Sequence, residues 1–408
     1  MIDLYRERTC RVCAGELDTI LDLGALHPSG FLRSEEQPLP RVPHDLCVCP
    51  HCKLVQLRHT VDPDVMFRQY WYLSGVNEVM REELADIVAK VQDRLNLTSE
   101  DLVMDIGAND GTLLSAYRPG PLKVAFEPAR NLNEELHRHA SVVISDYFPR
   151  GLRELTHVDH CAKVITAVAC FYDLDDPSAF LKAIADTLHP EGVFIVQFQD
   201  WDQMQQANAF DNICTEHLFY PSLASLERML EPHGLAVIDA ELRKINGGSY
   251  RLWIGHKTNE WVSPNVDALR MIEEGCEAWE TFDRFAYRCR AVKTQIQGFL
   301  SDTPGSIDIY GASTKFNTLA QWCGIDHRVV RQAWERSPAK FGLRTAGTNI
   351  PIVNEVVGRM DPPDVLFVGI WQFRDAVLQR EHRYLAEGGT MIFSLPRVDI
   401  VRGTQHGA

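Results

Sequence analysis

Two acids separated by a glycine-rich turn are the residues near the middle of the chain best suited to hold a ligand. Residues 102–104 predict a buried strand, a tight turn follows, and residues 123–126 predict a second strand that ends at Glu127. Glycines let the backbone approach a ligand, and the acid after the second strand accepts hydrogen bonds from ribose hydroxyls. The spacing is not GxGxxG, and no Lys-Ser/Thr pair follows. The loop therefore favours a nucleoside without a pyrophosphate, S-adenosylmethionine rather than NAD or ATP.

The plainer alternative is a Rossmann-like domain whose turn needs glycines for its shape alone. The joint presence of loop and acid at the expected distance favours the cofactor. The predicted cofactor contacts are Asp105, Gly107, Asn109, Asp110, Glu127 and Pro128, with Asp146 and Ala167 from later strand ends.

Four cysteines near the N-terminus have the spacing of a metal site. Cys10 and Cys13 form one CxxC pair, and Cys49 and Cys52 form another. Two such turns complete a tetrahedral Zn²⁺ site, and nothing suggests an open coordination position, so the metal is expected to be structural. Cys47 and His51 are close enough to compete as ligands. A reduced thiol cluster or a single redox CxxC are the alternatives. Residues 14–45 are rich in turn formers and are expected to be a loop held by the metal.

Three groups of polar and aromatic residues are candidates for chemistry on a substrate. Glu216 and His217 are adjacent, although such a histidine is more often structural. An aromatic loop precedes a helix expected at residues 78–95; it closes a core or forms a lid over the cofactor. Two glycines before Ser249 indicate a bulge or a close approach of the backbone to a ligand. The predicted substrate contacts are Tyr70, Asn77, Tyr220, Ser249 and Lys315.

The elements around these residues predict two α/β units. Strands are expected at residues 142–145, 163–168, 193–198, 236–239 and 250–254. One helix is expected to start near Pro177 and to stop by Gly192, and another is expected at 223–230. Ligands lie at the carboxyl ends of strands in such sheets, so Asp146, Ala167, Tyr172 and Gln199 should face the site. After a helical connector at residues 266–300, the strand–turn–helix pattern restarts. Gly311, Ala312 and Ser313 there could receive an anion at a helix N-terminus, or belong to a scaffold without a ligand.

Composition sets the wider limits. The 408 residues suffice for two or three domains, and the division expected is 1–62, 63–262 and 263–408. The net charge of −15, without a long basic run, argues against a nucleic-acid partner. No apolar run is long enough for a membrane span, and the first residues lack the apolar stretch of a secretory signal. Five of the 11 cysteines fall between Cys10 and Cys52, which favours metal over disulfides and a cytoplasmic location.

The order of several motifs resembles the three-domain sugar C-methyltransferases that act on nucleotide-linked deoxysugars. The motifs are CxxC…CPHC, DIGANDGTLL, AFEPARNL, FDNICTEH, GGSYRLWI, GASTKFNTL and AGTNIPI, and the resemblance covers essentially the whole chain. It implies an α/β fold with an N-terminal zinc-binding module, a central class I S-adenosylmethionine methyltransferase Rossmann-like domain and a C-terminal second Rossmann-like domain. It also implies that the C-terminal domain helps to hold the nucleotide sugar.

The resemblance further implies roles for single residues. The histidine of the family's FDxIxxEH motif is the base and follows a glutamate, which corresponds to His217 and Glu216. A tyrosine from the N-terminal loop reaches the active site; Tyr72 is the nearest match, and Tyr70 is next. Two departures stand out. Cys214 and Thr215 replace Tyr-His before the Glu-His pair, and Phe171-Tyr172-Asp173 replaces Ala-His.

The expected reaction is C-methylation beside the ketone of a nucleotide-linked 4-keto-6-deoxysugar. His217 would remove the proton next to the ketone, Glu216 could orient its ring, and Tyr72 or Tyr172 could donate to the enolate oxygen. The first alternative is an O- or N-methyltransferase for a sugar or another small molecule. The second is a binding or scaffold protein with a vestigial cofactor site, and a zinc-dependent nucleic-acid binder is a distant third. The sequence does not predict the oligomeric state.

Overall fold

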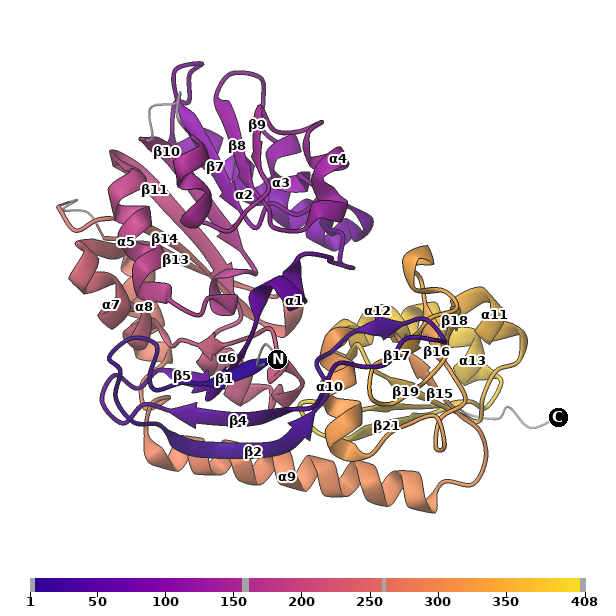
Figure 1. The fold of residues 1–408 in the computed structure, drawn as a ribbon. Helices are drawn as coiled ribbons and strands as arrows, with labels where there is room; N and C mark the ends of the chain where they lie inside the picture. The colour runs from indigo at the N-terminus through magenta and orange to yellow at the C-terminus, as the bar shows by residue number, and fades with distance from the viewer. Residues whose placement is uncertain (1–3, 156–160, 259–261, 404–408) are drawn as a thin grey trace.

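A computed structural model of the chain describes residues 4–155, 161–258 and 262–403. Figure 1 shows a small indigo β-module, a larger purple and magenta α/β unit, and an orange and yellow α/β unit. A long helix, α9 (Trp279–Asp302), runs along the base of the molecule between the two larger units. Among the described residues, no helix is long and apolar enough to cross a membrane.

The N-terminal module is an antiparallel sheet with strand order β12-β5-β4-β2. Residues 14–45, expected as a loop, instead contain all of β2 and β3 and the start of β4. The prediction was wrong because burial alternates along β2, with Leu21 and Leu23 inside and Asp18 and Asp22 outside, despite the many turn formers around it. The strands of the module are β1 (Tyr5–Glu7), β2 (Asp18–Leu26), β3 (Phe31–Leu32), β4 (Val42–Val48), β5 (Val55–Leu57) and β6 (His59–Val61).

The central unit is a seven-stranded sheet with order β13-β14-β11-β10-β7-β8-β9. Neighbours from β11 to β9 pair in parallel, whereas β14 pairs antiparallel with both β11 and β13. Every residue of β7 is buried, as expected for a parallel strand covered on both faces. The strands are β7 (Leu102–Ile106), β8 (Leu122–Phe126), β9 (Val142–Ile144), β10 (Ala162–Val168), β11 (Leu188–Phe198), β13 (Leu235–Arg243) and β14 (Ser249–His256).

The helices of this unit largely confirm the sequence pattern. The expected helix at 78–95 is α2 (Glu78–Arg94), and the one at 223–230 is α7 (Leu223–Leu230). The helix expected to start near Pro177 and to stop by Gly192 is α5 (Pro177–Thr187), and β11 begins directly after it at Leu188. The shorter helices are α1 (Pro63–Phe67), α3 (Thr112–Ser115), α4 (Asn133–Leu136), α5 (Pro177–Thr187) and α6 (Trp201–Gln206).

The C-terminal unit is a six-stranded sheet with order β18-β16-β15-β19-β20-β21, parallel except at β21. The connector expected at 266–300 is two helices, α8 (Pro264–Ile272) and α9, broken at residues 273–278. The remaining elements are β15 (Ile307–Tyr310), α10 (Thr314–Cys323), β16 (Ala333–Glu335), β17 (Arg344–Thr345), β18 (Ile352–Asn354), α11 (Glu355–Met360), β19 (Val365–Val368), α12 (Arg374–Arg380), α13 (His382–Ala386), β20 (Thr390–Phe393) and β21 (Asp399–Arg402).

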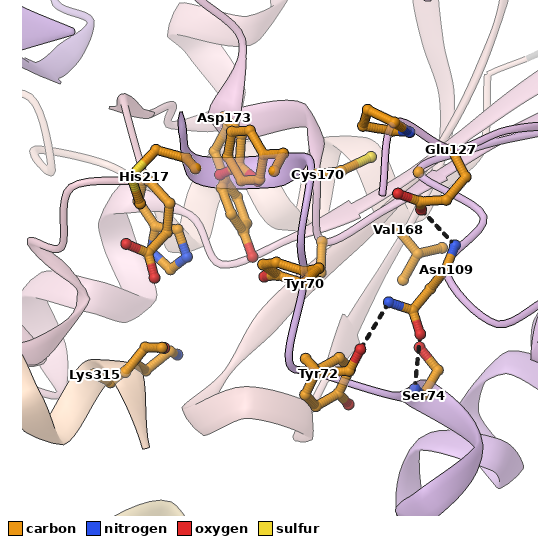
Figure 2. A pocket seen from close by; sticks show the side chains of 18 of the residues that line it. Tyr70, Tyr72, Ser74, Asn109, Glu127, Val168, Cys170, Asp173, His217 and Lys315 are labelled. Atoms are coloured by element: carbon orange, nitrogen blue, oxygen red, sulfur yellow. Dashed lines mark hydrogen bonds between the residues drawn. The ribbon is translucent and has the colours of Figure 1, made fainter. Parts of the chain in front are cut away.

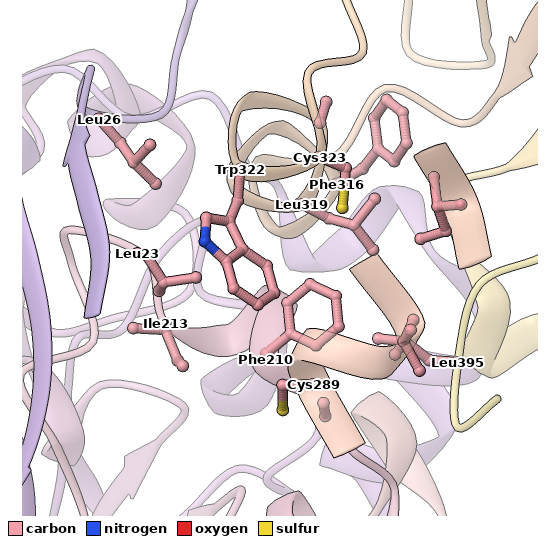
Figure 3. Close-up of a cluster of buried hydrophobic side chains, with 14 of the residues drawn as sticks. Leu23, Leu26, Phe210, Ile213, Cys289, Phe316, Leu319, Trp322, Cys323 and Leu395 are labelled. Atoms are coloured by element: carbon pink, nitrogen blue, oxygen red, sulfur yellow. The ribbon is translucent and has the colours of Figure 1, made fainter. Parts of the chain in front are cut away.

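The three parts share one hydrophobic core. Leu23 and Leu26 from β2, Phe210 from the central unit and Trp322 from α10 belong to the same buried cluster (Figure 3). The rings of Phe210 and Trp322 meet edge to face with centroids 4.9 Å apart. Strands also cross between parts: β12 (Phe219–Tyr220) joins β5, and β17 joins β3. The parts are therefore fixed against one another rather than joined by free linkers.

Candidate active site

A cavity of about 660 Å³ lies where the carboxyl ends of the central strands face α10 and the segment that follows β6. Most of the predicted site residues line it: Tyr70, Tyr72, Asn77, Asp105, Gly107, Asn109, Glu127, Pro128, Asp146, Tyr172, Glu216, His217 and Lys315. Five predicted residues of the described chain lie outside its wall, namely Asp110, Ala167, Gln199, Tyr220 and Ser249. Figure 2 shows His217 and Tyr70 turned toward the same space, with Glu127 and Asn109 farther along it.

The end of the cavity nearest β7 and β8 has the groups that a nucleoside requires. Both carboxylate oxygens of Glu127 accept backbone N–H groups, from Asn109 at 2.8 Å and from Ala129 at 2.8 Å. These bonds fix the carboxylate and leave lone pairs for further donors. Burial raises the pKa of Glu127 above its usual value. Asp105 accepts the Thr166 hydroxyl at 2.5 Å, and burial raises the pKa of Asp105 to about 7.

Gly107 lies close to the side chain of Cys170. Its φ is +68°, a conformation that favours glycine, and a Cβ there would lie 2.9 Å from the Cys170 sulfur. A side chain at this position would therefore fill the cradle between the turn and the residue after β10. The shape and the two carboxylates fit an adenosine group.

The side chains of Asn109 and Asp110 bind the backbone of the segment that follows β6. Asn109 donates to Tyr72 O at 3.0 Å and accepts from Ser74 N at 2.9 Å (Figure 2), and Asp110 accepts from Gly75 N at 2.8 Å. Their side chains thus bind the backbone of residues 63–77, which we call the strap. The strap begins with α1 and ends at the start of α2. The side chain of Asp110 is used in this way, and it lies outside the cavity wall.

Asp146, predicted at the adenine edge, lies at the cavity wall but is bound by arginines. Arg150 donates to both carboxylate oxygens, and Arg68 of the strap lies 3.4 Å from one of them. The hydrogen bond from Arg150 lowers the pKa of Asp146 to about 2, so the group is ionised. Its structural partners are therefore the strap and the segment after β9.

His217 has a defined orientation. Its Nδ1 lies 3.1 Å from the Asn212 carbonyl, and its ring packs edge-on against Tyr172 with centroids 4.4 Å apart. A carbonyl only accepts, so Nδ1 carries the hydrogen and Nε2 is the basic nitrogen. Burial, followed by the charge of Lys315, lowers the pKa of His217 to about 3, so the ring is neutral. The partner of Nδ1 is Asn212 rather than Glu216, which corrects the orienting role expected of that glutamate.

Two carboxyl groups in the cavity have unsatisfied oxygens. Within the described chain, neither Glu216 Oε2 nor Asp173 Oδ1 has a hydrogen-bond partner. Burial raises the pKa of Glu216, and burial together with the nearby Glu216 raises the pKa of Asp173 well above its usual value. No motif in the sequence points to Asp173 beyond its place in the unusual Phe-Tyr-Asp run. Lys315 of α10 lies on the facing wall, where its Nζ donates to Gln199 Oε1 at 3.2 Å.

The predicted residues outside the cavity wall support it from behind. The Tyr220 hydroxyl donates to Asn212 O at 2.8 Å and to His217 O at 3.1 Å, so it braces the turn that carries the histidine. The Ser249 hydroxyl donates to Ile245 O at 3.1 Å. The glycines before it approach protein side chains rather than a ligand, since a Cβ on Gly247 would touch Trp371 and one on Gly248 would meet Gln203. Ala167 is buried within β10.

The four predicted metal ligands come together in the N-terminal module. The sulfurs of Cys10, Cys13, Cys49 and Cys52 all lie within 4.8 Å of one another, with two of the pairs at 3.4 Å. Four thiolates at such separations suit the tetrahedral site that Zn²⁺ prefers. A Cβ on Gly15 would lie 2.9 Å from the His51 ring and 3.4 Å from the Cys13 sulfur, so the turn around the cluster is tightly packed. Cys47 is not in the cluster; its sulfur faces Asp45 O and Thr19.

The fold and the site define an S-adenosylmethionine-dependent methyltransferase. A family model described as "Methyltransferase domain" matches residues 76–240, which hold the seven-stranded sheet up to β13 and the cavity loops. A model described as "Putative zinc binding domain" matches residues 10–67, and "C-methyltransferase C-terminal domain" matches residues 244–396. The three matches follow one another along nearly the whole chain.

The order of the three matched models resembles that of a C-methyltransferase with an N-terminal zinc-binding domain. The chain is 29% identical over 406 residues to the C-methyltransferase NovU of Streptomyces niveus, with 96% of each chain covered. Its cofactor is S-adenosylmethionine, and the four-cysteine cluster is its zinc site.

Solved structures match the methyltransferase part more distantly. The magnesium protoporphyrin IX methyltransferase of Synechocystis PCC 6803 is 13% identical with a TM-score of 0.32, and the match covers 43% of this chain and 78% of that one. The mitomycin 7-O-methyltransferase MmcR is 18% identical with a TM-score of 0.34, and the match covers 44% of this chain and 55% of that one. Similarity at this level carries no argument about substrate.

Proposed function

We propose that the enzyme methylates a carbon next to the ketone of a nucleotide-linked 4-keto-deoxysugar. The observation that carries this proposal is the neutral His217, which turns a basic Nε2 into the cavity while Asn212 O holds Nδ1. A carbon acceptor has no lone pair, so a base must first remove its proton. An oxygen or nitrogen acceptor already has a lone pair and depends less on a base. A buried neutral imidazole is therefore better suited to a carbon acceptor.

When bound, S-adenosylmethionine would supply an electrophilic methyl group to the carbanion formed beside the ketone and would leave as S-adenosylhomocysteine. Glu127 and Asp105 would hold the nucleoside, with the turn at Gly107 closing against it. His217 would take the proton onto Nε2. The resulting imidazolium keeps its Nδ1–H bond to Asn212, so the ring need not turn between the two protonation states.

The negative charge that develops on the ketone oxygen requires donors. Tyr172 lies against the His217 ring, Tyr72 comes from the strap, and Asp173 offers an unsatisfied carboxyl oxygen in the same cavity. Burial raises the pKa of Tyr172 well above its usual value and that of Tyr72 to about 12. Both tyrosines therefore keep their protons near pH 7 and can donate, and burial also raises the pKa of Asp173, which favours its protonated, donating form.

The C-terminal wall of the cavity suits the nucleotide part of the substrate. Ser313 caps α10 by accepting from Phe316 N, and Ser313, Thr314 and Lys315 at the start of that helix line the cavity. Lys315, Arg336 and Lys340 line the same wall and add positive charge in a chain of net charge −15. This combination favours a phosphate-bearing substrate.

The test is an incubation with S-adenosylmethionine and a panel of nucleotide-linked 4-ketosugars, analysed by mass spectrometry and carbon NMR. The proposal predicts a mass gain of one methyl group and a new carbon–carbon bond next to the ketone. A methyl group on oxygen or nitrogen would instead identify the enzyme as an O- or N-methyltransferase. Binding of S-adenosylhomocysteine without transfer to any sugar of the panel would contradict the proposed acceptor class and leave the cofactor assignment standing.

A further inference from the structure

The zinc module lies against the two segments that carry the proposed catalytic residues. One segment, residues 172–175, follows β10 and contains Tyr172 and Asp173. The other, residues 214–220, contains Glu216 and His217. Both segments belong to the central unit in sequence, yet their backbone and side chains are bound by residues of the N-terminal sheet. This arrangement gives the metal module a role beyond its own folding.

Two successive backbone hydrogen bonds connect β5 to both segments. Leu57 N–H donates to Leu218 O at 2.9 Å, and Leu218 N–H donates to Tyr172 O at 2.8 Å. Strand β12 then pairs antiparallel with β5, with Phe219 opposite Gln56. The residue that directly follows His217 is thus held between the zinc module on one side and the Tyr172 loop on the other.

Gln56 links this strand to the metal ligands. It is fully buried, its Nε2 lies 3.3 Å from the Cys10 sulfur, and its Oε1 accepts from the Arg11 backbone N–H at 3.0 Å. A thiolate that is bound to metal is a good acceptor for such an amide. The position of Gln56, and with it the register of β5 against β12, is therefore fixed by the loaded cysteine cluster.

Arg11, inside the first CxxC pair, makes the second connection. Its buried guanidinium donates to Leu57 O at 2.5 Å and to Thr60 Oγ1 at 2.7 Å. Thr60 in turn donates to Asp175 Oδ1 at 2.7 Å, and Arg11 Nε lies 3.9 Å from the same carboxylate. Burial favours the neutral acid, but the Thr60 hydrogen bond and the charges of Arg8 and Arg6 outweigh it and lower the pKa of Asp175.

A third contact reaches the turn before the Glu216–His217 pair. His44 of β4 is buried, its Nδ1 lies 2.8 Å from Val42 O, and its Nε2 lies 3.0 Å from Thr215 Oγ1. Since Val42 O accepts the Nδ1 hydrogen, Nε2 accepts the hydroxyl of Thr215.

We propose that Gln56, Arg11 and Asp175 are positioning residues through which the zinc module sets the geometry of the active site. Resting on the proposed function, this inference makes the metal a requirement for methyl transfer but not for cofactor binding. The cofactor loops after β7 and β8 make their hydrogen bonds to the strap and to each other, away from β5. Loss of the metal should therefore loosen residues 172–175 and 214–220 first.

The test uses the zinc-loaded full chain with Gln56→Leu and Asp175→Asn, and Glu16→Gln, an exposed residue of the same module, as the control. We expect both variants to keep one zinc per chain and an S-adenosylhomocysteine affinity within about two-fold of wild type. A displacement of about 1 Å at the reacting groups costs roughly 100-fold, so kcat should fall about 10- to 100-fold with little change in KM. Amide hydrogen exchange over residues 214–220 should accelerate, while exchange in β7 and β8 stays slow.

The exchange measurement needs no sugar substrate, so it separates this inference from the proposed function. Unchanged exchange over 214–220 in Asp175→Asn, with kcat within two-fold of wild type, would overturn the inference. So would equal loosening of 102–127 and 214–220 after chelation of the zinc, because the metal would then stabilise the whole fold. If Gln56→Leu loses its zinc, the inference is tested with Asp175→Asn alone, because that substitution leaves the cysteine cluster untouched.

Discussion

His217 owes its neutrality to its surroundings rather than to a partner acid. Burial and the Lys315 charge both oppose protonation, and they lower the pKa of His217 to about 3. The base form is therefore fully populated across the physiological range. Because no protonation step intervenes, kcat/KM for methyl transfer should stay level from about pH 8 down to about pH 5. An acid limb centred near the unperturbed histidine value of ~6.5 would show that His217 is not buried in this way in the working enzyme.

Asp173 is the second residue whose chemistry is set by burial. Its charge interacts with Tyr70, Tyr172, Cys170, Cys214 and Glu216. Of these five neighbours, Glu216 is the carboxyl group. With its pKa raised, Asp173 donates while protonated, so kcat should fall as the pH rises through that pKa. Asp173→Asn keeps a donor at every pH and should lose this alkaline limb while retaining about a tenth of the activity.

Asp173→Leu, of similar volume but without a donor, should lose about 10²- to 10³-fold in kcat. Both variants are compared by steady-state kinetics between pH 6 and 10. An alkaline limb that persists unchanged in Asp173→Asn would assign it to another group.

At the scale of elements, the strap and its neighbours include one feature that the sequence predicts and two that it does not. The helix that ends the strap was predictable because Leu84, Ile87, Val88 and Val91 repeat at helical spacing, and Asn77 caps it. The hydrogen bonds of Asn109 to the strap could not be predicted, because its side-chain amide binds backbone groups 35 and 37 residues away. Strand β12 was missed for the same reason: its two residues acquire strand geometry only by pairing with β5, over 160 residues earlier.

The strap is also held by Asn131, which clamps one residue from both sides. Its Nδ2 donates to Tyr70 O at 2.9 Å, and its Oδ1 accepts from Tyr70 N at 3.0 Å. Asn131→Ala removes both bonds, so trypsin should cleave after Arg68 faster and kcat/KM should fall about ten-fold. Asn133→Ala is the matched control, because Asn133 bonds to Ser145 and leaves the strap alone. Equal cleavage rates in the two variants would refute the clamp.

At the scale of the whole molecule, the shared core predicts that the three parts unfold together. Trp322 packs on Phe210 and belongs to a cluster that includes Leu23 and Leu26 of β2 (Figure 3). Trp322→Ala should lower the free energy of unfolding by about 3–5 kcal/mol. Calorimetry should show one transition that shifts as a whole. Separate transitions, with only the last one shifted, would mean that each part is stable alone.

The division into parts was visible in the sequence, whereas their mutual contacts were not. CxxC pairs, the glycine loop and the restart of strand–turn–helix after residue 300 each have local signals. Contacts such as Trp371 Nε1 to Asp211 at 2.8 Å have none, because no periodicity relates residues from different units. The cavity arises from such contacts, which is why its C-terminal wall could be expected only from the family resemblance.

The central claim is that His217 removes a proton from carbon, and a deuterium wash-in experiment tests it most directly. The enzyme is held with S-adenosylhomocysteine and an accepted nucleotide 4-ketosugar in deuterated water, so that no methyl can be transferred, and the sugar is followed by mass spectrometry. We predict that wild type exchanges the proton next to the ketone and that His217→Asn, with unchanged S-adenosylhomocysteine affinity, does not. Wash-in at the wild-type rate in His217→Asn would contradict the claim.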